Sequence, residues 1–339
     1  SPMLKARFID VMYTHTEGQL TCIVNSGIPY PPGTDILQKR DFLAEKYGDL
    51  KNSLMHEPRG HPSMYGGFLT PPSSVDYDAG IIWTDGVIYN DMCGHGTIAL
   101  GMAMVSNGLV EEGDSGLTTI RLETMAGLVT AEVSSTEDRV EWTKFENVPA
   151  YVAEQDVPIE LPGYGALKAD IVFGGNYFAT VRWDNPDLMV CPENESRFCE
   201  MGQLVKQQIK DKVKLRHPTK QHIDYVDIVT FWHDSTRPEA FYRNVHVIGG
   251  LWGDRSPGGT GTSAMMAMLE ARGKIKMGQT IQSEGLLGSG TFEGCLVRET
   301  KLGNHRAVVP TVKGTANIIG YAKWLLDPND PVSKGFVTS

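Results

Sequence analysis

The chain carries one glycine-rich frame twice, and an Ala/Met-rich stretch follows each copy. The first copy reads CGHGTIA at residues 93–99 and the second reads GGTGTSA at residues 258–264, so both fit x-Gly-x-Gly-Thr-x-Ala. A glycine turn that leads into a helix presents free backbone N–H groups and a partial positive charge, which suit an anion. Two such turns in one chain predict two half-sites that face one small anionic substrate.

The segments around the two frames follow the same order in both halves. The first half predicts strands within 8–24, a helix over 35–54, a hairpin over 79–89, a helix over 97–107 and strands over 117–145. The second half predicts strands over 167–182, a helix over 197–213, strands over 225–231 and 243–251, a helix over 262–272 and further strands. An internal duplication explains this order. We therefore expect an N-terminal lobe of residues 1–150, on which residues 325–339 pack back, and a C-terminal lobe of residues 151–324.

The stretches that follow the two glycine turns are apolar nearly all round. Residues 98–105 read IALGMAMV and residues 264–269 read AMMAML. A helix without a polar face must be buried, so each half is expected to enclose its own helix. Gly108 and Gly273 are the expected C-caps of these helices. A strand-rich half wrapped around one buried helix meets these demands.

Cys93 and His95 are the candidate reactive side chains of the first frame. The N-terminus of a helix favours a thiolate, which can act as a nucleophile or as a general base. His95 could hydrogen-bond either that thiol or a substrate. The alternative is a small buried thiol beside a structural histidine. Because both residues stand at one helix start, we favour a functional role.

The second frame has no reactive side chain at its first position, because Gly258 stands there. The residues before it read DRSP at 254–257. Asp254 could hold a substrate cation while the helix N-terminus holds a carboxylate, and together these demands describe an amino acid. From spacing alone, a surface ion pair or a turn cap explains Asp254 equally well.

Charge and motifs argue against several other classes of function. The formal net charge of -10 disfavours nucleic acid and anionic membranes as partners. The longest apolar runs are far shorter than the roughly 20 residues that span a bilayer. Neither glycine turn has the lysine of a phosphate-binding loop or the Rossmann glycine spacing, which disfavours a nucleotide. The Gly-x-Ser-x-Gly elbow of many serine hydrolases is absent as well.

The cysteine pattern favours free thiols. The chain has five cysteines, at positions 22, 93, 191, 199 and 295. An odd number at irregular spacing argues against a disulfide framework and fits a reducing cytoplasm, where we expect the protein to be located. Cys191 and Cys199 do not have the spacing of zinc ligands, so no metal site is expected.

Taken together, these motifs resemble those of the proline racemase family, which includes 4-hydroxyproline epimerases and trans-3-hydroxyproline dehydratases. The most specific matches are MCGHG at 92–96, DRSP at 254–257 followed by GTGT at 259–262, and EPRGH at 57–61. Weaker matches are HTEG at 15–18, PEA at 238–240 and GSGTF at 288–292. They extend over nearly the whole chain and keep the order found in the family.

The resemblance implies a fold and a ligand class. The fold would be α+β and diaminopimelate-epimerase-like, with two pseudo-symmetric lobes, each a curled β-sheet around a central buried helix, and an active site in the cleft between the lobes. The ligand would be a small imino acid, proline or a hydroxyproline. The resemblance implies neither a metal nor an organic cofactor, and it implies a homodimer.

The resemblance also assigns roles to single residues. Cys93 would be the general base or acid, and Asp254 would contact the substrate amine. The substrate carboxylate would lie on the backbone amides of Gly94, His95, Gly259 and Thr260. Positions beside the substrate ring match Tyr65, Asp227 or Ile228, and Ile248.

Gly258 departs from the family pattern, in which racemases and epimerases have a cysteine at this position and dehydratases typically a threonine. Without a side chain there, the chain lacks the second thiol that an exchange of protons between two thiols requires, and a general acid or base contributes about 10²- to 10⁴-fold. Three hypotheses follow: a dehydratase with Cys93 as its only thiol base; a racemase or epimerase in which water or another residue replaces the thiol; and a protein that only binds an imino acid.

Overall fold

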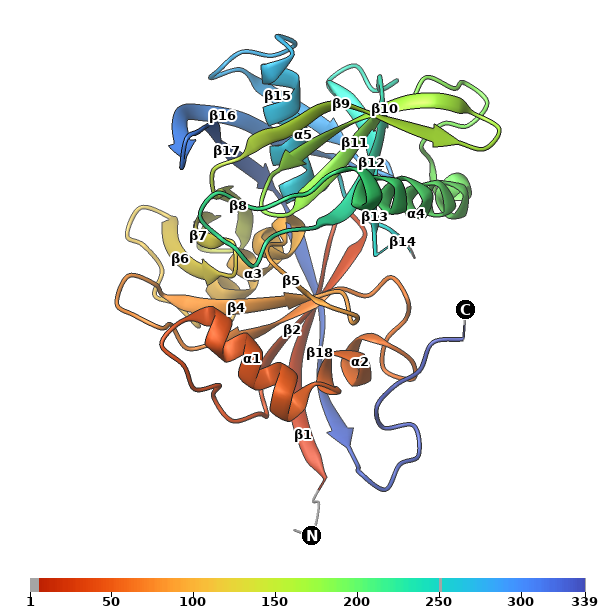
Figure 1. Ribbon diagram of the computed structural model, residues 1–339. Helices are drawn as coiled ribbons and strands as arrows, with labels where there is room; N and C mark the ends of the chain where they lie inside the picture. The colour runs from red at the N-terminus through yellow and green to blue at the C-terminus, as the bar shows by residue number, and fades with distance from the viewer. Residues whose placement is uncertain (1–5, 250–251, 339) are drawn as a thin grey trace. The chain divides into compact units, whose positions relative to one another are not determined.

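The computed structural model describes residues 6–249 and 252–338. The chain divides into two compact units (Figure 1). Unit 1 comprises the chain up to residue 90, residues 96–143 and the chain from residue 315, and unit 2 comprises residues 91–95 and 144–314. The described part contains no helix that is long and apolar enough to cross a membrane.

Unit 1 is one mixed sheet with helices packed on it. Its strands pair in the order β7 (Gly127–Ser135), β6 (Leu117–Thr124), β4 (Ala79–Thr84), β3 (Gly66–Thr70), β2 (Gln19–Ser26), β1 (Arg7–Thr16) and β18 (Ala316–Leu326), and β5 (Tyr89–Asn90) also pairs with β4. The pairs β2–β3 and β4–β6 are parallel and the others are antiparallel. Turns at Glu17-Gly18 and Asp85-Gly86 join β1 to β2 and β4 to β5.

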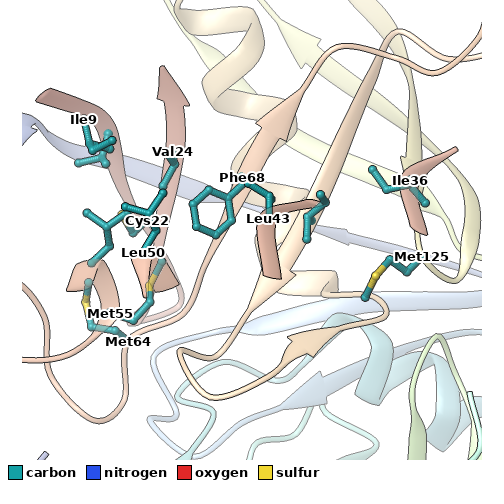
Figure 2. Close-up of a cluster of buried hydrophobic side chains, with 13 residues drawn as sticks. Ile9, Cys22, Val24, Ile36, Leu43, Leu50, Met55, Met64, Phe68 and Met125 are labelled. Carbon is teal, nitrogen blue, oxygen red and sulfur yellow. The ribbon is translucent and has the colours of Figure 1, made fainter. Parts of the chain in front are cut away.

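Apolar side chains fix two short helices, α1 (Ile36–Tyr47) and α2 (Leu50–Met55), to this sheet. Figure 2 shows their buried residues among those of β1, β2 and β3. Burial of each large side chain contributes roughly 1.5–3 kcal/mol to stability. The main members of this cluster are Ile9, Cys22, Val24, Ile36, Leu43, Leu50, Leu54, Met55 and Phe68.

Unit 2 is a longer sheet that curls around one helix. Its strands pair in the order β9 (Tyr151–Leu161), β10 (Gly165–Phe173), β11 (Tyr177–Arg182), β12 (Val226–His233), β13 (Tyr242–Ile248), β15 (Thr280–Glu284), β16 (Thr291–Leu302) and β17 (His305–Gly314). A bridge between Ala150 and Val308 brings β17 back to the start of β9. Helix α5 (Gly259–Ala271) packs against strands from both ends of this order, and residues 259–269 are all buried.

The two units repeat the same order of elements. In unit 1, β1 and β2 are followed by α1 and α2, then β3, β4, β5, α3 (Gly94–Ser106), β6 and β7. In unit 2, β10 and β11 are followed by α4 (Glu195–Lys212), then β12, β13, β14 (Trp252–Gly253), α5, β15 and β16. Parallel pairs fall at equivalent places, β11–β12 and β13–β15. The expected α+β class with two related lobes is confirmed.

Several elements differ between the prediction and the structure. The helix expected over 35–54 is two helices, because Gly48 and Asp49 interrupt it; glycine has low helix propensity, and aspartate favours helix starts. Strand β9 was not predicted, since its charged residues and Pro158 hide the alternation of a strand. Both buried helices start earlier than predicted, within the glycine frames. Helix α3 ends at Ser106 and α5 at Ala271, with Arg272 as the C-cap of α5, so the left-handed Gly108 and Gly273 each lie two residues past a helix end. Residues 250 and 251 of one predicted strand lie outside the described residues.

Candidate functional site

Cys93 lies in the short segment that connects β5 to α3, directly before the first helical residue, Gly94. Its side chain is buried, with 4% of the residue exposed. The sulfur is 3.5 Å from Nδ1 and 3.6 Å from Nε2 of His95, so the thiol and the imidazole are in hydrogen-bonding contact. Contacts assign residues 91–95 to unit 2, where they lie with the second glycine frame.

His95 also contacts Asp254, which follows the short strand β14. The His95 Nδ1 atom is 3.5 Å from Oδ2 of Asp254, and both side chains are buried. The other carboxylate oxygen, Oδ1, accepts hydrogen bonds from the Ser256 N–H at 2.8 Å and the Ser256 hydroxyl at 2.7 Å. Asp254 is therefore held in one orientation, and the histidine lies within reach of both the thiol and this carboxylate.

The charges of this cluster depend on one another. Burial acts to lower the pKa of His95, but the neighbouring Cys93 and Asp254 outweigh it and raise that pKa to about 10. Burial acts to raise the pKa of Asp254, but the His95 cation and hydrogen bonds from His95 and Ser256 hold that pKa below its usual value. At neutral pH the cluster therefore contains an imidazolium beside a carboxylate.

The two glycine frames approach each other at Gly94 and Gly259. A Cβ atom built on Gly94 would lie 2.2 Å from the Cα of Gly259, and one built on Gly259 would lie 2.4 Å from the Cα of Gly94. Side chains do not tolerate such distances to a backbone, so both positions require glycine. The backbone N–H groups of these residues and of His95 and Thr260 lie in the first turns of the two helices.

Asn176 holds the two frames together and was missed by the sequence analysis. Its side chain pairs with both backbone groups of Met92: Oδ1 accepts from the N–H at 3.3 Å, and Nδ2 donates to the carbonyl at 2.7 Å. Nδ2 also lies 3.5 Å from the Thr260 hydroxyl. In the sequence, Asn176 stands out only as a polar residue after Gly174-Gly175. In the fold, its side chain binds the backbone of the Cys93 segment.

His246 was missed as well. It lies on β13 beside Thr230 of β12, and its ring packs behind Gly258 and Gly261 at the start of α5. A signal was present, because the alternation of a strand places Asn244 and His246 on one face, together with Tyr242 and Ile248.

The positions assigned to the substrate ring fall in both units. Ile228 and Ile248 pair directly across β12 and β13 in unit 2, and the neighbouring Asp227 is buried. Tyr65 is buried in unit 1, where its ring centroid is 6.2 Å from that of Trp83.

Two further expectations concern the state of the cysteines and the binding of a metal. All five cysteines are free thiols, including Cys191 and Cys199. Within residues 6–249 and 252–338, no group of three or more His, Cys, Asp or Glu side chains is arranged to hold a metal ion.

Comparisons with known proteins cover almost the whole chain. The 4-hydroxyproline 2-epimerase of Cereibacter sphaeroides is 60% identical over 328 residues, which are 97% of each chain. The trans-3-hydroxy-L-proline dehydratase of Azospirillum brasilense is 34% identical over 98% of each chain. The crystal structure of a hydroxyproline epimerase from Agrobacterium vitis with bound trans-4-OH-L-proline superposes with a TM-score of 0.91 at 30% identity, and covers 98% of this chain and 95% of that one. A family described as proline racemase matches residues 11–337, and the chain belongs to this family.

Proposed function

We propose that this protein is an enzyme that inverts the α-carbon of 4-hydroxyproline, with Cys93 as its thiol base. The identity of 60% to a 4-hydroxyproline 2-epimerase over nearly the full length of both chains supports this substrate class. The observation that carries the chemistry is the buried cluster of Cys93, His95 and Asp254 at the meeting point of the two glycine turns.

The substrate would be bound through its two charged groups. Its carboxylate would accept hydrogen bonds from the backbone amides of Gly94, His95, Gly259 and Thr260, since helix N-termini stabilise anions. Its amine would lie against the Asp254 carboxylate. Both charges of an imino acid would then be neutralised in a buried site, and the α-carbon would be left beside the Cys93 sulfur.

The reaction would begin with the transfer of the α-proton to the Cys93 thiolate. The His95 imidazolium is in contact with this sulfur. The electron pair left on the α-carbon would delocalise into the carboxylate, where the amide donors stabilise the added charge. Inversion then requires a proton delivered to the opposite face of the α-carbon. Since residue 258 is a glycine, a water molecule or another residue must supply that proton.

Dehydration of trans-3-hydroxyproline is the second candidate, and Gly258 is the observation that favours it. In this reaction one base removes the α-proton, the electron pair forms a double bond to the β-carbon, and the β-hydroxyl leaves with a proton as water. No proton returns to the opposite face. The 34% identity to a trans-3-hydroxy-L-proline dehydratase also supports dehydration. Binding of an imino acid without turnover is the third reading.

Proton NMR in heavy water separates these readings. The protein is incubated with L-proline, both 4-hydroxyproline epimers and trans-3-hydroxy-L-proline. We expect α-deuterium to appear with inversion of a 4-hydroxyproline, and Cys93→Ser to reduce the rate by at least about 10²-fold, the contribution of a general base. Loss of the 3-hydroxyl group would instead identify the dehydratase.

Two controls sharpen this experiment. Cys295→Ser changes a half-buried thiol on β16 and should leave the rate unchanged. Prolinamide keeps the amine but lacks the carboxylate, so it should neither exchange nor compete. If Cys93→Ser retains the full rate, Cys93 is not the base; if the ligands bind without exchange, the protein is only a binder.

We also propose that the active form is a homodimer, as the family resemblance implies.

A further inference from the structure

The ring of His246 fills the space in which a side chain at position 258 would lie. A Cβ atom built on Gly258 would be 2.4 Å from Cδ2 and 2.5 Å from Nε2 of this ring. One built on Gly261 would be 2.1 Å from Nε2. Cβ atoms essentially never come within 3.0 Å of another group, so the imidazole excludes side chains from both positions.

The hydrogen bonds of His246 tie its ring to the turn before α5. Nε2 is 2.9 Å from the carbonyl oxygen of Pro257, and Nδ1 is 2.6 Å from the Thr230 hydroxyl. Since a carbonyl oxygen can only accept, the Pro257 contact requires the hydrogen on Nε2 and Nδ1 as the acceptor from the hydroxyl, whereas donation from the Asn244 amide to Nε2 requires the other tautomer. The side-chain amide of Asn244 lies 2.8 Å from the same Nε2. Both ring nitrogens are thus occupied by protein groups.

This contact fixes an unusual backbone conformation. Gly258 has φ 84° and ψ 124°, in the positive-φ region that residues with a side chain rarely adopt. The carbonyl of the peptide bond that precedes it is the group bound by His246. The imidazole therefore holds the turn in a conformation that suits glycine.

The ring is also uncharged at neutral pH. Burial lowers the pKa of His246, and the nearby His95 cation acts in the same direction, whereas Asp254 and the Pro257 carbonyl act against it. A neutral imidazole with both nitrogens engaged is suited to hold a peptide bond, and it has no lone pair free for a substrate proton.

We propose that His246 is a positioning residue that takes the place of a side chain at position 258 and locks the start of α5 in a glycine-only conformation. This inference deepens the proposed function on which it rests, because it explains why the second glycine frame carries no acid or base. It implies that Gly258 and His246 depend on each other. A cysteine at position 258 could serve as a second thiol only after His246 had been made smaller.

A double-mutant cycle tests whether the His246 ring and a side chain at position 258 would occupy the same space. Its readout is stability, so it does not depend on activity. Gly258→Ala, His246→Val and the double variant are compared with the parent protein by thermal unfolding. We expect Gly258→Ala to lower Tm by several degrees more in the parent than in the His246→Val background. The strain of a positive φ is present in both backgrounds, so it cancels in the difference. Equal losses in Tm would refute the shared space, whatever reaction the enzyme performs.

A second variant separates positioning from proton transfer. His246→Gln keeps an N–H group that can reach the Pro257 carbonyl, but glutamine cannot exchange a proton with substrate. We expect this variant to keep the α-proton exchange rate within about 10-fold of the parent, with the same pH profile, whereas His246→Val should lose more. A loss of about 10²- to 10⁴-fold in His246→Gln would show a general acid or base and overturn the positioning role. His233→Gln is the matched control, since His233 is also buried in this sheet but accepts its hydrogen bond from the Val190 N–H, at 2.9 Å.

Discussion

At the scale of single residues, His95 is the centre of the candidate site because it contacts both Cys93 and Asp254. Burial alone would keep an imidazole neutral, yet the two neighbours outweigh burial. The charges of His95 and Asp254 thus depend on each other. The sequence placed Cys93 and His95 together by their spacing, but only the fold brought Asp254 to them.

The pH dependence of stability should report this cluster. His95 has its pKa raised from 6.5 to about 10, so its stabilising contribution is complete below about pH 6.5 and is lost as the pH rises toward 10. Asp254 has its pKa held below 3.8, so its contribution is present above that pH and is lost in acid. We expect His95→Gln to lower the free energy of unfolding by roughly 3 kcal/mol between about pH 4 and 6.5, because it leaves a buried carboxylate unpaired.

Urea unfolding of the parent and of His95→Gln at a series of pH values measures this difference. The gap between the two proteins should shrink steadily as the pH rises from about 6.5 to 10. A gap that is constant over this range would mean that His95 is neutral in the folded protein.

At the scale of elements, the glycine frames matter because two chain segments meet there without side chains. Gly94 and Gly259 leave their backbones close enough that a single methyl group would collide. Asn176 then fastens the Cys93 segment to the second frame through Met92 and Thr260. The duplicated motif is therefore a contact between two turns.

Gly259→Ala should disturb this contact. The added Cβ would lie 2.4 Å from the Gly94 Cα, so a backbone must shift, at a cost of about 1–3 kcal/mol in the free energy of unfolding. A shift of the reacting groups by about 1 Å can lower a rate by roughly 10²-fold. Thermal unfolding and α-proton exchange measure both effects.

Gly320→Ala is the control for this prediction. Gly320 lies on β18 and has open space around its Cα, so the added methyl group should leave the exchange rate unchanged. If Gly259→Ala and Gly320→Ala have the same stability and the same exchange rate, the close approach of the two frames contributes to neither.

At the scale of the whole molecule, one plan of strands and helices is used twice, with parallel pairs at equivalent places. The two copies have diverged at the first position of the frame, where one has Cys93 and the other Gly258.

Light scattering at several protein concentrations should give twice the mass of one 37.2 kDa chain if the proposed homodimer forms. A single-chain mass at every concentration would contradict it.

The sequence by itself determined the two frames, the buried helices that follow them and the repeated order of elements. These features depend on neighbours a few residues apart, through the freedom of glycine at positive φ and through hydrophobic period. The tertiary structure alone decided that His246 lies behind Gly258 and that Asn176 grips Met92, 84 residues away in the chain. Such partners are set by strand pairing and by the curl of a sheet around its helix, and neither is encoded in the spacing of the residues that meet.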